Sequence, residues 1–161
     1  MAPVKIRLLT YNILDGGHKR EAKIVEVIKA VAPDVVVVQE GLEAAPFRRI
    51  AAALEMTPCL TETRHRLSLR VGLLSRLPVL DFRTLHLWPV WPGCVQATVQ
   101  LAKGYSLTVY GLHLAAYYPW FLEWWRTYQV CAYSDTSNRW RRDNTSSLAT
   151  STPSHLGIKL H

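Results

Sequence analysis

Cysteine is scarce in this sequence, and the few cysteines present form no recognisable framework. There are three among 161 residues, their number is odd, and no two of them are spaced as a CxxC pair. This usage argues against a structural zinc site and against a disulfide scaffold. It favours a protein of a reducing compartment.

Long apolar segments are also missing. The longest uncharged, largely apolar run covers residues 114–122 and contains Pro119, which is far below the ~18 residues that a membrane span needs. Residues 1–7 include no uninterrupted apolar stretch of the kind that marks a signal peptide. We therefore expect a cytoplasmic protein without a transmembrane segment.

Acidic residues are outnumbered by basic ones. There are 12 Asp and Glu against 19 Lys and Arg, which gives a formal net charge of +7 and a pI near 9.6. Such a charge favours polyanionic partners such as nucleic acid or phosphorylated substrates, and it is also compatible with a merely soluble basic surface. With a hydrophobic fraction of 49%, the chain is long enough for one domain with a core. No specific protein partner is predictable.

The most regular apolar run lies at residues 34–40, where four consecutive valines precede Gln39 and Glu40. An unbroken β-branched run predicts a strand that is buried on both faces at the centre of a sheet. Glu40 would then stand at the carboxyl end of a central strand, where α/β proteins tend to place chemistry, and Gly41 would allow a sharp turn. The alternative is that Glu40 only marks the exit of the strand into water.

A strand–helix–strand unit leads to the valine run. Alternating residues predict a strand from about residue 4 to Asn12, and apolar residues at helical spacing predict a helix over 19–31, stopped by Pro33. A helical crossover makes its two strands parallel, so their carboxyl ends emerge at the same edge of the sheet. Asn12 and Glu40 are therefore predicted to lie near each other.

The remaining chain is predicted to combine helices with antiparallel strands. A helix is expected at 46–56, ended by Pro58, and strands at 70–75, 79–87, 94–101 and 105–112. A short amphipathic helix is expected at 120–130. In the last 30 residues, 132–161, ten are Ser or Thr and apolar periodicity disappears, so this tail is predicted to be disordered or loosely attached.

Four short motifs occur in order along the sequence. They are IRLLTYNI at residues 6–13, PDVVVVQE at 33–40, GLLSRLP at 72–78 and YGLHL at 110–114. Together, over roughly residues 4–130, they resemble the endonuclease/exonuclease/phosphatase superfamily, the metal-dependent phosphodiesterases related to DNase I. The resemblance implies an α/β (α+β) fold, a four-layer αββα sandwich of two mixed sheets flanked by helices, with the site at one end.

The resemblance also implies hydrolysis of phosphate esters assisted by Mg²⁺, or by Mn²⁺. By position, Glu40 resembles the family's metal-binding glutamate, Asn12 the asparagine beside the metal and the scissile phosphate, and His113 the histidine that acts at the phosphate. A single glutamate with a neutral amide suits Mg²⁺, which prefers few carboxylates together with water and phosphate oxygens. A nearby histidine can donate to phosphate or handle a proton.

Each candidate also has a purely structural interpretation. Asn12 could be an ordinary polar residue at a strand end, and His113 a core histidine satisfied by the backbone. Arg76, on the loop after a strand, could bind substrate phosphate or could be solvated. Asp15 and His18 are interpreted as loop residues. The aromatic side chains of the second half could stack bases or meet lipid, although packing is the commoner role.

The sequence departs from the family pattern after His113. It has neither the Gly-Asp-x-Asn motif nor the terminal Asp-His pair that supplies the family's general base. We therefore expect residues 1–131 to be a partial, incomplete domain of this kind and residues 132–161 an aberrant tail, as in a truncated or frame-shifted product. The leading hypothesis is an Mg²⁺-dependent phosphodiesterase with impaired activity.

Two alternatives remain open. One is a non-catalytic basic module that binds nucleic acid or phosphorylated lipid head groups. The other is an incomplete gene product with no function of its own. The substrate of an active enzyme, whether DNA, RNA, a phospholipid head group or an inositol phosphate, is not specified by the sequence, and neither is the oligomeric state.

Overall fold

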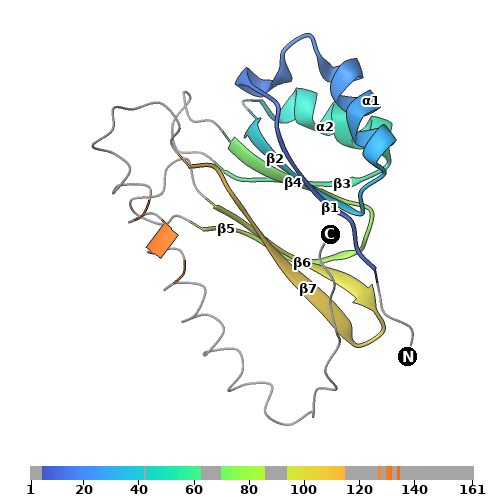
Figure 1. The fold of residues 1–161 in the computed structure, drawn as a ribbon, viewed down its shortest axis with the longest axis vertical. Helices are drawn as coiled ribbons and strands as arrows, with labels where there is room; N and C mark the ends of the chain where they lie inside the picture. The colour runs from blue at the N-terminus through green and yellow to red at the C-terminus, as the bar shows by residue number, and fades with distance from the viewer. Residues whose placement is uncertain are drawn as a thin grey trace.

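The computed structural model describes residues 5–41, 43–62, 70–85 and 94–114, together with Thr127, Val130, Cys131 and Ser134. Its elements in chain order (Figure 1) are β1 (Leu8–Asn12), the 3-10 helix η1 (Asp15–Gly17), α1 (Glu21–Val31), β2 (Val35–Gly41), α2 (Ala44–Leu54), β3 (Thr57–Leu60), β4 (Arg70–Ser75), β5 (Val79–Leu85), β6 (Cys94–Ala102) and β7 (Tyr105–Leu112).

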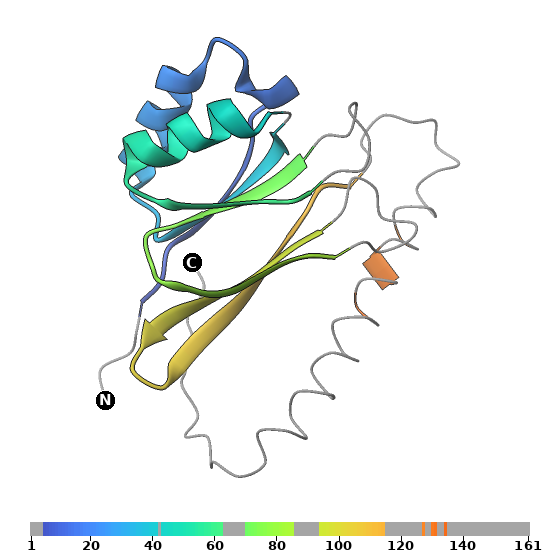
Figure 2. The same cartoon turned by 180° about the vertical axis from the view of Figure 1, so that it is seen from behind.

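These elements form two β-sheets that face each other. The first has the strand order β1-β2-β4-β3 and the second the order β5-β6-β7. Both views show α1 and α2 covering the outer face of the first sheet (Figures 1 and 2). The first sheet is mixed, because β1 pairs with β2 in parallel while β4 pairs antiparallel with both β2 and β3. The predicted mixed α/β fold with two sheets is confirmed.

The valine run forms β2, an interior strand of the first sheet. Val36 and Val38 pack with the helices, whereas Val35 and Val37 pack with the second sheet. All four are at most 5% exposed. Burial of a valine side chain stabilises a fold by roughly 1.5–3 kcal/mol. Because its valines pack on both sides, this strand joins the two halves of the core. The prediction of a central strand buried on both faces is confirmed.

Both helices of the described part lie close to their predicted ranges. α1 begins at Glu21 rather than near residue 19, because Lys19 has a left-handed backbone with φ +57°. α2 begins at Ala44, before Pro46. Proline is tolerated in the first turn of a helix, because the N–H that it lacks would have no partner within the helix there. Each helix ends on a left-handed residue, Ala32 and Glu55 respectively.

β3 is the element that the sequence pattern does not predict. It pairs antiparallel with β4 at the edge of the first sheet and contains Pro58, which the pattern instead assigns to the end of a helix. Proline is tolerated in this strand because an edge strand has one side without ladder hydrogen bonds. α2 therefore ends three residues before Thr57, and the chain turns directly into a strand.

Two predictions fall on other parts of the chain. The helix expected at 120–130 and the tail at 132–161 lie outside the described residues, apart from Thr127, Val130 and Ser134. The domain boundary at 131 stays a prediction. Among the residues that the structure describes, no helix is long and apolar enough to cross a membrane.

The two sheets approach closely at Gly111 of β7. A Cβ atom built at this position would lie 2.6 Å from Val95 Cγ1 of the second sheet and 2.7 Å from Val37 Cγ1 of the first. Branched core side chains cannot move aside easily, so a residue without a Cβ is required here. This contact fixes how β7 lies against β2, two residues before His113.

We expect Gly111→Ala to lower the free energy of unfolding by about 1–3 kcal/mol, because the added methyl group overpacks the contact between the sheets. Gly41→Ala is the matched control, because a Cβ there would meet its nearest neighbours at 3.7 and 3.8 Å, which is ordinary contact. Urea unfolding of both variants measures the difference. An unchanged stability of Gly111→Ala would contradict the close approach of the sheets.

Candidate functional site

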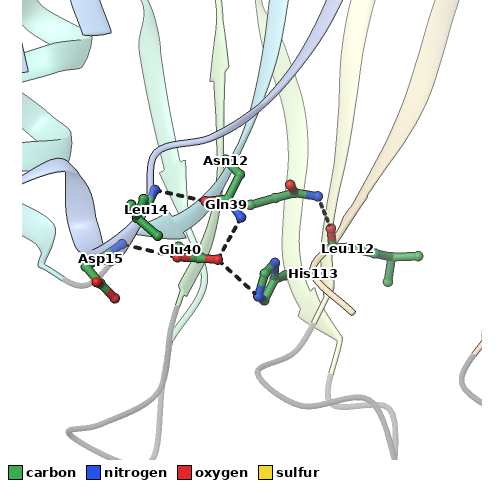
Figure 3. Close-up of polar contacts among 7 residues, drawn as sticks. All are labelled: Asn12, Leu14, Asp15, Gln39, Glu40, Leu112 and His113. Carbon is green, nitrogen blue, oxygen red and sulfur yellow. Dashed lines mark hydrogen bonds and ion pairs between the residues drawn. The ribbon is translucent and has the colours of Figure 1, made fainter. Parts of the chain in front are cut away.

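Three strand ends meet at one end of the two-sheet structure (Figure 3). Asn12 ends β1, Glu40 lies near the end of β2, and His113 follows β7. Asn12 Nδ2 donates to Glu40 Oε1 at 2.6 Å, and His113 Nε2 lies 3.7 Å from the same oxygen. The proximity of Asn12 and Glu40 expected from the parallel crossover is present, and His113 joins them from the second sheet.

The Glu40 carboxylate is enclosed and holds two neutral donors. The residue is 7% exposed. Its Oε1 accepts from the Asn12 amide, and its Oε2 accepts from the backbone N–H of Asp15 at 3.1 Å. An ionised carboxylate has about four acceptor sites. Each oxygen can therefore accept a further ligand, and the two hydrogen bonds already fix the orientation of the carboxylate.

The backbone at Glu40 is itself unusual. Its φ is +63°, and the pairing of β2 with β4 shifts register between Val38 and Gly41. A bulge of this kind re-aims a side chain at a strand end. A left-handed conformation costs a residue other than glycine roughly 1–2 kcal/mol. The sharp change of direction expected at Gly41 therefore lies at Glu40, while Gly41 continues the strand.

The segment after Asn12 supplies the second donor to Glu40. Asn12 Oδ1 accepts from the Leu14 N–H at 2.9 Å, which closes a local side-chain turn. Residues Asp15–Gly17 form the 3-10 helix η1, and φ is positive at all four residues from Leu14 to Gly17. This conformation presents the Asp15 N–H to Glu40 (Figure 3).

Gly17 is needed in this loop for two reasons. Its φ is +66°, and a Cβ there would lie 2.5 Å from Ile24 Cδ1 on α1. The loop therefore packs tightly on the helix that follows it. Asp15, interpreted from the sequence as a loop residue, contributes its backbone N–H to the site. The adjacent Gly16-Gly17 pair is the sequence signal that could have indicated a loop with positive φ.

Gln39 joins the two halves of the site and was not singled out from the sequence. Its Nε2 donates to the carbonyl oxygen of Leu112 at 2.6 Å (Figure 3). Gln39 belongs to the first sheet and Leu112 ends β7 of the second. Since His113 follows Leu112 and Glu40 follows Gln39, this one bond places the next residue of each strand face to face.

Arg76 is not brought to this cluster. Its backbone N–H donates to Asp34 O at 2.9 Å and its Nε donates to Pro33 O at 3.2 Å, so it lies beside the residues that precede β2. Glu40 lies at the other end of that strand. His18 is exposed. The Trp and Tyr side chains considered for base stacking, at positions 88, 91, 117, 118, 120, 124 and 125, lie outside the described residues.

The cluster fits a hard cation with few protein ligands. Among the described residues, Glu40 makes no ion pair with a lysine or an arginine, and His113 balances it only when protonated. A buried carboxylate whose charge is not compensated favours a bound cation. The described part of the chain places no group of three or more His, Cys, Asp or Glu for a metal. One carboxylate beside an amide suits Mg²⁺, which keeps several waters.

A sequence model of the Endonuclease/Exonuclease/phosphatase family matches residues 9–151 of the chain. No curated protein sequence matches it significantly. Similar solved structures include TDP2 from C. elegans, with a TM-score of 0.68 and 16% identity over 86% of this chain and 45% of that one.

Two further structures are similar. D. rerio TDP2 complexed with single strand DNA product has a TM-score of 0.62 and 18% identity over 78% of this chain and 52% of that one. The human Nocturnin catalytic domain with bound sulfate anion has a TM-score of 0.56 and 17% identity over 74% of this chain and 54% of that one. This chain thus spans about half the length of each of these proteins. At such identities the likeness concerns the fold.

We expect Gln39→Met to lower the free energy of unfolding by about 1–3 kcal/mol, because the Leu112 carbonyl loses its donor at a partly buried position. The matched control is Gln96→Met. Gln96 is 2% exposed and its Nε2 has no hydrogen-bond partner among the residues that the structure describes, so its replacement should leave stability equal or higher. Urea unfolding compares the two. Equal losses in both variants would contradict a stabilising bridge between the sheets.

Proposed function

The chain belongs to the Endonuclease/Exonuclease/phosphatase family, and on this basis we propose that it hydrolyses phosphate esters where Asn12, Glu40 and His113 meet. The observation that carries the proposal is the enclosed carboxylate of Glu40, whose two oxygens are oriented by neutral donors and whose charge faces a histidine. This arrangement supplies an anchor for a cation and a proton donor within a few ångströms of each other. Both can accelerate phosphoryl transfer.

Each residue has a distinct proposed role. Glu40 holds a divalent cation, Mg²⁺ or Mn²⁺, which when bound supplies polarisation of a phosphoryl oxygen and orientation of the attacking water. Asn12 fixes the rotamer of Glu40 through Nδ2 and lies exposed at the same strand end, where it can contact the phosphate. His113 donates a hydrogen bond or a proton to the phosphate from the second sheet.

Nucleic acid is the proposed substrate class. The net charge of +7 favours a polyanion over a small neutral ester. The D. rerio TDP2 structure, which has a similar fold, holds a single strand DNA product. We take a single-stranded oligonucleotide as the first substrate to test.

Hydrolysis by this chain is proposed to be slow. The sequence carries no Gly-Asp-x-Asn motif after His113, and it carries no Asp-His pair, the motif that supplies the general base in the family. Loss of the general base while binding groups remain typically lowers kcat by several orders of magnitude. The assay must therefore be sensitive to single turnovers.

A non-catalytic role is the alternative that the basic charge supports. In that case the chain would bind nucleic acid or phosphorylated lipid head groups without cleaving them, and binding would weaken steeply with salt but would not need a divalent cation. Binding of a labelled oligonucleotide across a salt series, with and without chelator, separates the two functions. Cleavage that stops on chelation supports hydrolysis; binding without any cleavage supports the alternative.

We expect Glu40→Gln to remove all Mg²⁺-dependent cleavage of a single-stranded oligonucleotide, because the neutral amide cannot compensate the charge of the cation. Glu26→Gln is the matched control, since Glu26 lies exposed on α1. Single-turnover assays with and without chelator measure the rates. A Glu40→Gln rate equal to that of the parent protein would rule out the proposed site.

A further inference from the structure

Arg20 makes a pair of contacts next to the site that are unusual for a residue at a helix start. Its Nη2 donates to the backbone carbonyl oxygens of Ile13, at 2.9 Å, and of Leu14, at 2.5 Å. These two residues immediately precede Asp15, whose N–H donates to Glu40 Oε2. One guanidinium group thus holds the peptide units that lead to a donor of the site.

The main chain of Arg20 is anchored on both sides. Its N–H donates to Gly17 O at 2.9 Å, and its carbonyl oxygen accepts from the Ile24 N–H at 3.0 Å as the first bond of α1. The guanidinium therefore reaches back from a fixed helix end to the loop. Movement of the loop relative to α1 would break the contacts with both carbonyl oxygens.

The loop needs such a restraint. Leu14 and Asp15 have φ of +50° and +47°, a conformation that residues with a Cβ adopt rarely. Such a conformation persists only where several contacts determine it. Among the described residues, three further bonds hold it: Leu14 N–H to Asn12 Oδ1, Gly17 N–H to Leu14 O, and Asp15 N–H to Glu40 Oε2 itself. Hydrogen bonds from the charged guanidinium of Arg20 are stronger than the first two of these, which join neutral groups.

Helix capping does not account for this arginine. Within the described part of the chain, α1 has no side-chain cap hydrogen bond at its N-terminus, and Arg20 occupies the N-cap position before Glu21. A positive charge at the N-terminus of a helix is unfavourable for the helix dipole, where aspartate or serine would stabilise it. An arginine here opposes the local preference of the helix, and its contacts serve the loop instead.

We propose that Arg20 is a positioning residue: it fixes the loop of residues 13–17 so that the Asp15 N–H orients the Glu40 carboxylate for a divalent cation. The effect on the cation rests on the proposed function, whereas the effect on the Asp15 N–H does not. Groups that orient a metal-binding carboxylate typically change metal affinity by about 10- to 100-fold.

The chain offers a matched control at the other end of α1. Arg7 Nη1 donates to the carbonyl oxygens of Val31, at 2.6 Å, and of Ala32, at 3.2 Å. Arg7→Gln therefore removes the same type of contact without touching the loop at Asp15. Arg20→Gln and Arg7→Gln should lose similar stability, and only the first should affect the site.

The test compares the full-length parent protein with Arg20→Gln, Arg20→Lys and Arg7→Gln. Mn²⁺ titration gives the dissociation constant, and NMR gives the hydrogen-exchange rate of the Asp15 amide. In Arg20→Gln we expect Mn²⁺ binding to weaken by about 10-fold or more and Asp15 exchange to accelerate by a similar factor. Arg20→Lys should restore part of both, because lysine can still donate to a carbonyl oxygen.

Unchanged Asp15 exchange and unchanged Mn²⁺ affinity in Arg20→Gln would overturn the proposal, as would equal changes in Arg7→Gln. If the parent protein binds no Mn²⁺, the proposed function fails, and Asp15 exchange alone decides the role of Arg20. If Arg20→Gln does not fold, the comparison of Arg20→Lys with the parent protein decides it in the same way.

Discussion

The hydrogen bond from Gln39 Nε2 to the carbonyl oxygen of Leu112 is the contact on which the site depends. It joins the two sheets at the point where each continues into a candidate residue, Glu40 on one side and His113 on the other. The valines of β2 make this possible, because they pack on the helices with one face and on the second sheet with the other. Gly111 then lets β7 approach β2 closely. The separation of 3.7 Å between His113 and Glu40 follows from these packing constraints.

Glu40 and several residues near it depart from the backbone conformations and charges that are locally preferred. Glu40, Leu14 and Asp15 all have positive φ, although none of them is glycine. Arg20 places a positive charge at the start of a helix. Natural proteins keep such unfavourable features mainly where function requires them, and they balance the cost elsewhere, here in the buried strands. All of these features converge on the orientation of one carboxylate, which supports the view that this carboxylate has a ligand.

Much of the fold could be predicted from the sequence, because the valine run and the helical spacing before it are strong, local patterns. They sufficed for the central strand, the parallel crossover and the proximity of Asn12 to Glu40. β3 could not be predicted, since it is short and contains Pro58. The position of Arg76 could not be predicted either, because motif order does not say that β4 runs antiparallel to β2, which places the carboxyl end of β4 beside the start of β2. The bond between Gln39 and Leu112 depends on how two sheets pack, which no local pattern encodes.

The proposed function depends on the Glu40 carboxylate, which lies where the two sheets meet and is proposed to hold a divalent cation. Paramagnetic broadening by Mn²⁺ in the NMR spectrum of the parent protein tests this most directly, because signals close to a bound Mn²⁺ ion disappear before those of distant residues. We predict early loss of the Asn12 side-chain amide, the Asp15 amide and the His113 ring signals, with the amides of Lys103 and Gly104, which precede the opposite end of β7, retained. Broadening centred on another surface, or none at all, would contradict it.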